Sequence, residues 1–383
     1  MSVRPITRRL TDAQLVSAQF RYSDPENSIA GLNLGVPDPE AHPIIIGYYD
    51  ETPPGGRAGN PNATFIRCCH CGKRRHWKGH VVRDDRGETY IIGASQCGRE
   101  HYGVRYDDAE KAFKAEQARR AALIRWTNMV KLVANYRSEV TQLLQAPALG
   151  ELDLKRDELR RACSEGFGKL VRIATSAEPM FETREERDYE AEKERQTRFE
   201  RAWAVYQALP SVERRRRRDE GLKPEEDTSP IYRRASTPLG HLVGGGFLTD
   251  RGDARQFALD LRKTLDAVGA VDHAGTDSAT TTDLNRLLRE MTDKPRALDK
   301  ALAEASFASL FFERENLDRI ERWSSGEARF SYQRDGAALV IEDGSLRRAR
   351  IEPLDKVEFP YHRSLQAAEY LDDQFLPEIV EAA

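Results

Sequence analysis

One stretch decides how the N-terminal region folds: Cys68-Cys-His-Cys-Gly-Lys-Arg-Arg-His-Trp-Lys-Gly-His80, then Val81-Val-Arg-Asp-Asp-Arg-Gly-Glu-Thr-Tyr-Ile-Ile-Gly93, then Ala94-Ser-Gln-Cys-Gly-Arg-Glu-His101. Two residues separate Cys68 from Cys71, and Gly72 permits the sharp turn that lets both thiolates reach one ion. The residues on either side of the turn at 84–87 predict a β-hairpin. Cys97 and His101 are four residues apart, so they share one face of the helix expected after the hairpin.

The distribution of cysteines favours a metal site over disulfides. Four of the five cysteines lie within 30 residues, beside several histidines. The N-terminus has no apolar stretch typical of a secretory signal, and no segment approaches the roughly 18 apolar residues of a membrane span. We therefore expect a cytoplasmic protein without a membrane segment, in which clustered thiols bind metal.

The chain thus presents a Cys-x-x-Cys turn (the zinc knuckle), then a hairpin, then a helix that carries further ligands. This order resembles the treble-clef zinc fingers, in particular a type associated with phage and mobile-element proteins. The resemblance covers about 35 residues. It implies a structural Zn²⁺ held by three cysteines and one histidine: Cys68, Cys71, Cys97 and His101. Four further side chains are close enough in sequence to replace one of these ligands: Cys69, His70, His76 and His80. A closed site with four protein ligands leaves no position for a reactive water, so the ion would stabilise the fold and not catalyse.

The charge of the finger favours nucleic acid as a partner. The whole chain of 383 residues has a formal net charge of only −3. Residues 61–105, however, contain nine Lys or Arg against four Asp or Glu. Basic side chains with an interleaved aromatic ring suit phosphate contact and base stacking, which makes candidates of Lys73, Arg74, Arg75, Trp77 and Lys78. The alternative is that Trp77 packs in the small finger core and the basic side chains are solvated.

The leading prediction is a non-catalytic protein that binds DNA or RNA. A first alternative is a protein-interaction scaffold that zinc staples together. A second is a metal-dependent nuclease, because His80-Val-Val and the turn after it look superficially like the first catalytic strand of the histidine-asparagine-histidine (HNH) endonucleases. No asparagine lies between His80 and the helix, so we expect no enzyme and keep His80 as a weak catalytic candidate. The run Arg214–Arg218 is interpreted as a solvated face at a helix end, which the helix dipole also favours; the alternative is a site that binds phosphates or an acidic partner.

The remainder of the chain predicts mostly helices. A heptad-like seam runs through residues 122–143 and suggests a homo-oligomer or a docked partner helix. A second helix is expected at 152–176, and a third from Thr183, which forms a capping box with Glu186, to about Leu209. Further helices are expected at 252–267, 281–292, 295–323 and 364–373. The Asp-Gly turns at 335–336 and 343–344 predict a small three-stranded sheet.

The expected fold class is mainly α, within α+β. The expected organisation is an N-terminal region over 1–106 with the zinc finger at 66–104, a helical bundle or coiled-coil hairpin over 107–218, a linker or hinge over 219–246, and a C-terminal α+β region over 247–383. The charged fraction of 32% agrees with long, solvent-facing helices.

Overall fold

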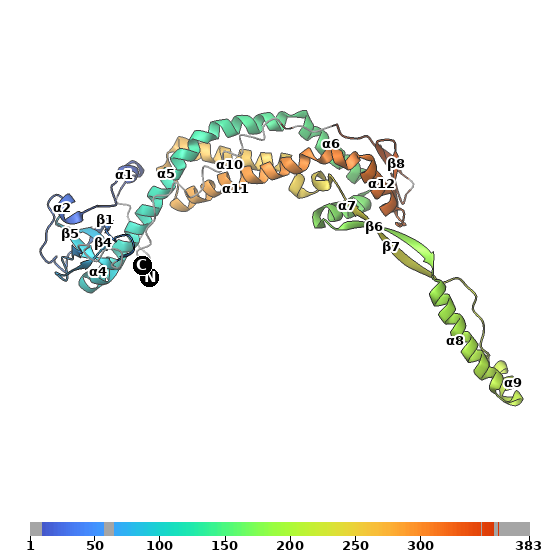
Figure 1. Ribbon diagram of the computed structural model, residues 1–383. Helices are drawn as coiled ribbons and strands as arrows, with labels where there is room; N and C mark the ends of the chain where they lie inside the picture. Colours follow the sequence, from blue (N-terminus) through green and yellow to red (C-terminus); the bar gives the residue numbers. More distant parts are fainter. Residues whose placement is uncertain (1–9, 57–64, 346, 356–358, 360–383) are drawn as a thin grey trace. The chain divides into compact units, whose positions relative to one another are not determined.

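The computed structural model describes residues 10–56, 65–345, 347–355 and 359 (Figure 1). The described residues form two compact units. The first contains residues up to 141 together with 259–296, and the second contains 142–258 together with those from 297 onward. Helices dominate both units and the sheets are small and antiparallel, so the expected class, mainly α with some β, is confirmed.

The N-terminal part of the first unit is built around a three-stranded antiparallel sheet. Its order is β1-β4-β5, with β1 at Ile44–Asp50, β4 at Lys78–Arg83 and β5 at Thr89–Gly93. A two-stranded ribbon of β2 (Ile66–Arg67) and β3 (Arg74–His76) precedes β4. Within the described residues, three short helices accompany the strands: α1 at Asp12–Ser17, α2 at Pro25–Ser28 and α4 at Ala94–Tyr102. The predicted hairpin and the helix after it are thus present.

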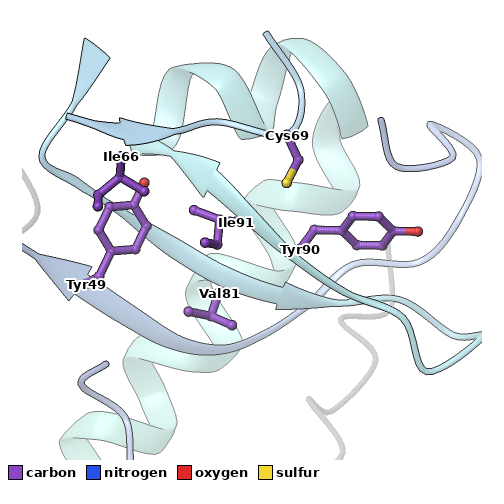
Figure 2. Close-up of a cluster of buried hydrophobic side chains, with 6 residues drawn as sticks. All are labelled: Tyr49, Ile66, Cys69, Val81, Tyr90 and Ile91. Carbon is purple, nitrogen blue, oxygen red and sulfur yellow. The ribbon is translucent and has the colours of Figure 1, made fainter. Parts of the chain in front are cut away.

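A compact apolar cluster holds this module together (Figure 2). Val81 of β4 and Ile91 of β5 are fully buried at its centre. The other members come from β1, β2, β5 and the turn after β2: Tyr49, Ile66, Tyr90 and Cys69. Because β4 and β5 are buried on both faces, the module has an apolar core in addition to the thiol cluster.

The long helix α5 (Val104–Gln145) follows directly, and its 42 residues make it about 63 Å long. The predicted heptad seam lies on this helix, and every one of its residues is buried: Ala122, Trp126, Met129, Val133, Tyr136, Val140 and Leu143. Arg137 of α5 donates to the carbonyl oxygen of Leu265 in α10 (Ala254–Ala274), 3.1 Å away. The seam is therefore covered within the chain itself, and it does not offer an exposed stripe to a partner helix.

The structure corrects two expectations in the middle of the chain. The helix predicted from Thr183 is instead a strand, β6 (Pro179–Arg187), and the expected linker contains its antiparallel partner, β7 (Tyr232–His241). Helix α8 (Tyr189–Ala208) begins only after Asp188, whose Oδ1 accepts the Ala191 N–H. The predicted helix at 152–176 is divided at Cys163 into α6 (Pro147–Ala162) and α7 (Ser164–Ser176), and α9 (Ser211–Asp219) follows α8.

The C-terminal part agrees more closely with expectation. One continuous helix, α11 (Thr281–Ser306), contains Pro295 and takes the place of the helix predicted at 281–292 and of the first part of the one predicted at 295–323. Helix α12 (Arg314–Ser324) precedes the predicted three-stranded sheet, which has the order β10-β9-β8. Its strands are β8 (Phe330–Asp335), β9 (Ala338–Asp343) and β10 (Arg348–Ile351). The helix expected at 364–373 lies outside the described residues. Among the described helices, none is long and apolar enough to cross a bilayer.

Candidate metal centre

Four side chains of the N-terminal module converge on one point. Cys68 and Cys71 come from the turn between β2 and β3, His76 is the last residue of β3, and Cys97 is in the first turn of α4. Their four ligand atoms all lie within 4.8 Å of one another. Gly72 has a φ of +67°, so the conformation that the sharp turn after Cys71 requires is present.

The distances within this group fit a tetrahedral zinc ion. Nε2 of His76 lies 3.7 Å from Sγ of Cys71 and 3.7 Å from Sγ of Cys97. With Zn–S bonds of about 2.3 Å and a Zn–N bond of about 2.0–2.1 Å, a tetrahedron places sulfur and nitrogen about 3.6 Å apart. Three sulfurs and one imidazole nitrogen are also the donor set of many structural zinc sites. The group is therefore compatible with zinc in both geometry and chemistry.

The thiols of the group influence each other's ionisation. Burial and the neighbouring Cys68 raise the pKa of Cys97 to about 12. Burial also opposes ionisation of Cys71, but the backbone N–H of Lys73 and hydrogen bonds from the other thiols outweigh it and hold the pKa of Cys71 below its usual value. Without a cation the negative charge concentrates on part of the cluster, whereas a divalent ion would allow all three thiolates to form together.

Gly93 leaves the space that the imidazole ring of His76 occupies. A Cβ at this position would lie 2.2 Å from Cγ of His76, a distance that real Cβ atoms do not show. The backbone N–H of Gly93 also donates to Sγ of Cys68 over 3.3 Å. Gly93 therefore leaves room for the imidazole ring and at the same time orients a sulfur ligand, as outer partners of metal sites commonly do.

The structure corrects the expected fourth ligand, His101. Its Nε2 lies 2.9 Å from the carbonyl oxygen of Pro37, so Nε2 carries the proton, and its Nδ1 lies 2.9 Å from Nδ1 of His70. Both ring nitrogens thus have partners outside the thiol group. His101 shares a helical face with Cys97, as the spacing predicts, but it is one turn further along α4, where the loop at Pro37 packs. The sequence also admits His76 as a ligand, and the space at Gly93 is the feature that distinguishes it.

Cys69 and His80, which the sequence also admits as ligands, lie outside the group. Cys69 is buried, donates to the carbonyl oxygen of Asn33 and has a pKa that burial raises. His80 is buried on β4, with Nδ1 2.7 Å from the hydroxyl oxygen of Tyr106. Burial lowers the pKa of His80 to about 4, which keeps the ring neutral. This environment suits a packing residue and disfavours the catalytic role that a nuclease would give His80.

Of the five candidate residues for nucleic acid, three have a side-chain partner in the structure and two are exposed without an acidic partner in the part of the chain that the structure describes. Arg74 is paired with Glu26 at 2.6 Å and Lys78 with Asp50 at 3.1 Å. Trp77 stacks on Phe65, with ring centroids 4.5 Å apart and planes 5° from parallel, so this face of its indole is not free for a base. Lys73 and Arg75 are exposed, and neither forms an ion pair with an acidic side chain of the described residues.

Arg75 is placed beside the metal group itself. Its Nε lies 3.4 Å from Nε2 of His76, and hydrogen bonds and charge from Cys97 and Cys71 raise its pKa. A zinc ion with three thiolates and one histidine carries a net charge of about −1, which an adjacent guanidinium offsets. No family model, no curated protein and no solved structure matches this chain, so the site must be interpreted from its own geometry.

Proposed function

We propose that this protein is a non-catalytic, zinc-stabilised nucleic-acid-binding protein whose N-terminal module is a treble-clef finger. The observation that carries the zinc assignment is the convergence of Cys68, Cys71, His76 and Cys97 within 4.8 Å. Four protein donors complete a tetrahedral shell, so the ion contributes folding free energy and has no open position for a substrate or an activated water.

The finger's contact with nucleic acid is assigned to Lys73 and Arg75. Both are exposed on the short ribbon that carries the zinc ligands, and zinc would fix the backbone of that ribbon. Phosphate contacts by Lys and Arg supply most of the affinity of nucleic-acid binding that does not depend on sequence. Because Trp77 is stacked on Phe65, we assign no base stacking to it and restrict the proposed contact to phosphates.

The test is fluorescence anisotropy of the zinc-loaded full chain with labelled duplex DNA and with single-stranded RNA at low salt. The variant Lys73→Glu/Arg75→Glu should bind at least tenfold more weakly. A matched control is Arg160→Glu/Arg161→Glu, which changes two exposed arginines of α6 by the same total charge. Equal affinity of the finger variant and the wild type, at unchanged zinc content, would show that the finger makes no such contact.

A further inference from the structure

A projecting arm in the second unit has a strongly divided charge. The arm consists of residues 188–231, which are α8, α9 and the segment that returns to β7 at the end of the β6–β7 ribbon (Figure 1). Its tip, residues 198–223, contains eight basic and four acidic residues. Its base, residues 188–197 and 224–231, contains two basic and seven acidic residues. The positive charge of the arm is therefore concentrated at its tip.

The arginines at the tip are not needed to pack the helix that carries them. No residue of α9 is buried, and Tyr206 is the one buried residue of α8. The hydroxyl of Tyr206 donates to the carbonyl oxygen of Arg214, which attaches the start of α9 to α8. A helix of nine residues is marginal in water, and five consecutive arginines repel each other. Packing therefore does not account for the run.

The acidic residues near the run neutralise only part of it. Three of the five arginines pair with acidic neighbours within the tip, as Arg216–Glu220, Arg217–Glu213 and Arg218–Asp219. Exposed pairs of this kind are weak and exchange readily with other anions. The side chain of Arg214 bonds to the neutral Gln207, and the side chain of Arg215 has no ion pair or hydrogen bond with any described residue. Lys223 adds a further charge beside α8, 5.5 Å above the ring of Trp203.

The length and composition of the tip favour the phosphates of a nucleic acid over a membrane surface as its anionic partner. Helix α9 is about 13 Å long, a distance over which duplex DNA presents about eight phosphate charges. Guanidinium groups bind phosphate oxygens in pairs, which suits a run made of arginine and not lysine. A helix lying on a membrane needs a continuous apolar face, but Val212 is the sole large apolar residue of α9.

We propose that the arm tip is a second nucleic-acid contact, in which the arginines of α9 bind the phosphate backbone independently of sequence. This inference rests on the proposed function, since it assigns a further surface to the same ligand. It places one contact on the zinc module of the first unit and another on the arm of the second.

The experiment uses the full zinc-loaded chain and a labelled 20-base-pair DNA duplex, with affinity measured at several KCl concentrations. The variant Arg214→Gln/Arg215→Gln removes the two arginines without acidic partners, and glutamine keeps a similar helix propensity. We expect at least tenfold weaker binding at 0.1 M salt. We also expect the slope of log K against log salt to fall by about 1.8, which corresponds to two phosphate contacts. The control Arg160→Gln/Arg161→Gln has the same net charge and should retain the affinity and slope of the wild type.

The finger variant Lys73→Glu/Arg75→Glu, measured beside it, separates the two proposals. Loss in the arm variant alone supports the arm contact and refutes the finger contact, whereas loss in the finger variant alone refutes the arm contact. Additive loss in the two supports both, and a wild-type chain that does not bind refutes both. Polyglutamate and phosphatidylserine vesicles serve as the other anions. If the arm variant weakens binding to either of them and leaves DNA binding unchanged, the tip recognises an acidic protein or a membrane and the proposal is wrong.

Discussion

Replacing the fourth metal ligand should distinguish the two histidines directly. Structural zinc sites contribute about 10–16 kcal/mol of apparent binding free energy, so an equal share for each of four ligands is about 2.5–4 kcal/mol. At 1.4 kcal/mol per factor of ten, His76→Ala should weaken zinc binding roughly 60- to 700-fold. The 3.7 Å separations of Nε2 from two sulfurs are the reason to assign this loss to His76.

His101→Ala is the matched control, since it also truncates a half-buried histidine of the same module. It removes the hydrogen bonds of His101 with Pro37 and His70, each contributing about 1 kcal/mol to stability. We therefore expect a lower free energy of unfolding but a zinc affinity within a few-fold of the wild type.

Competition with a chromophoric zinc chelator measures the affinity of each variant, and elemental analysis gives the zinc content. The reasoning would be refuted if His101→Ala lost zinc by two orders of magnitude while His76→Ala retained it. In that case His101 would be the fourth ligand, and the contact between His76 and Gly93 would be incidental.

Three further changes test other parts of the molecule. Gly93→Ala should lower the free energy of unfolding by about 1–3 kcal/mol and weaken zinc binding, because the new methyl group displaces the imidazole of His76. The control is Gly168→Ala, whose new methyl group meets no atom within 4 Å, so urea unfolding should show an unchanged or higher stability. Arg119→Met should lower the free energy of unfolding by about 3–5 kcal/mol because it removes a buried guanidinium that pairs with the buried carboxylate of Asp12, and a loss under 1 kcal/mol would contradict this. The pKa of about 4 for His80 means that the unfolded chain binds a proton more readily between pH 6.5 and 4, so stability should fall by about 3 kcal/mol as the pH drops through this range. His80→Gln should remove that part of the pH dependence, and an identical pH profile for the variant would refute the assignment.

Local patterns predict those elements whose stabilising contacts are close in sequence. The hairpin of β4 and β5 and the sheet of β8 to β10 follow from turn residues and alternation, and their partners are neighbours along the chain. Strand β6 could not be found in this way, because its partner β7 is about 50 residues away and the Thr183–Glu186 spacing imitates a helix cap. A contact that is distant in sequence also holds this strand in place. The buried carboxylate of Glu182 binds Arg322 and Arg184 and fixes β6 against α12. Similarly, the two helices predicted at 281–292 and 295–323 are joined across Pro295 in α11.

The candidate metal site shows the same limit. Spacing alone indicated Cys68, Cys71 and Cys97, because two belong to a tight turn and the third to the helix that faces it. The choice among several nearby histidines depends on which ring has space, and that space is created by Gly93 on a different strand. This glycine identifies the histidine only once the packing that brings the end of β5 beside the end of β3 is known.

Counting charged residues along the sequence is a poor guide to how many basic side chains remain unpaired in the folded protein. Residues 61–105 have an excess of basic residues, but five of the nine are paired with acidic side chains from outside that range: Glu26, Asp38, Glu40, Asp50 and Asp107. The arm tip differs, because every ion pair of its arginine run is formed with an acidic residue already counted within the tip. Its excess charge is consequently not reduced by folding, while that of the finger shrinks to a few side chains around Lys73 and Arg75. If both surfaces bind nucleic acid, replacing two basic side chains by neutral ones should reduce the salt dependence of binding at least as much in the arm as in the finger. The net charges of the two segments, taken from the sequence alone, would not have indicated this result.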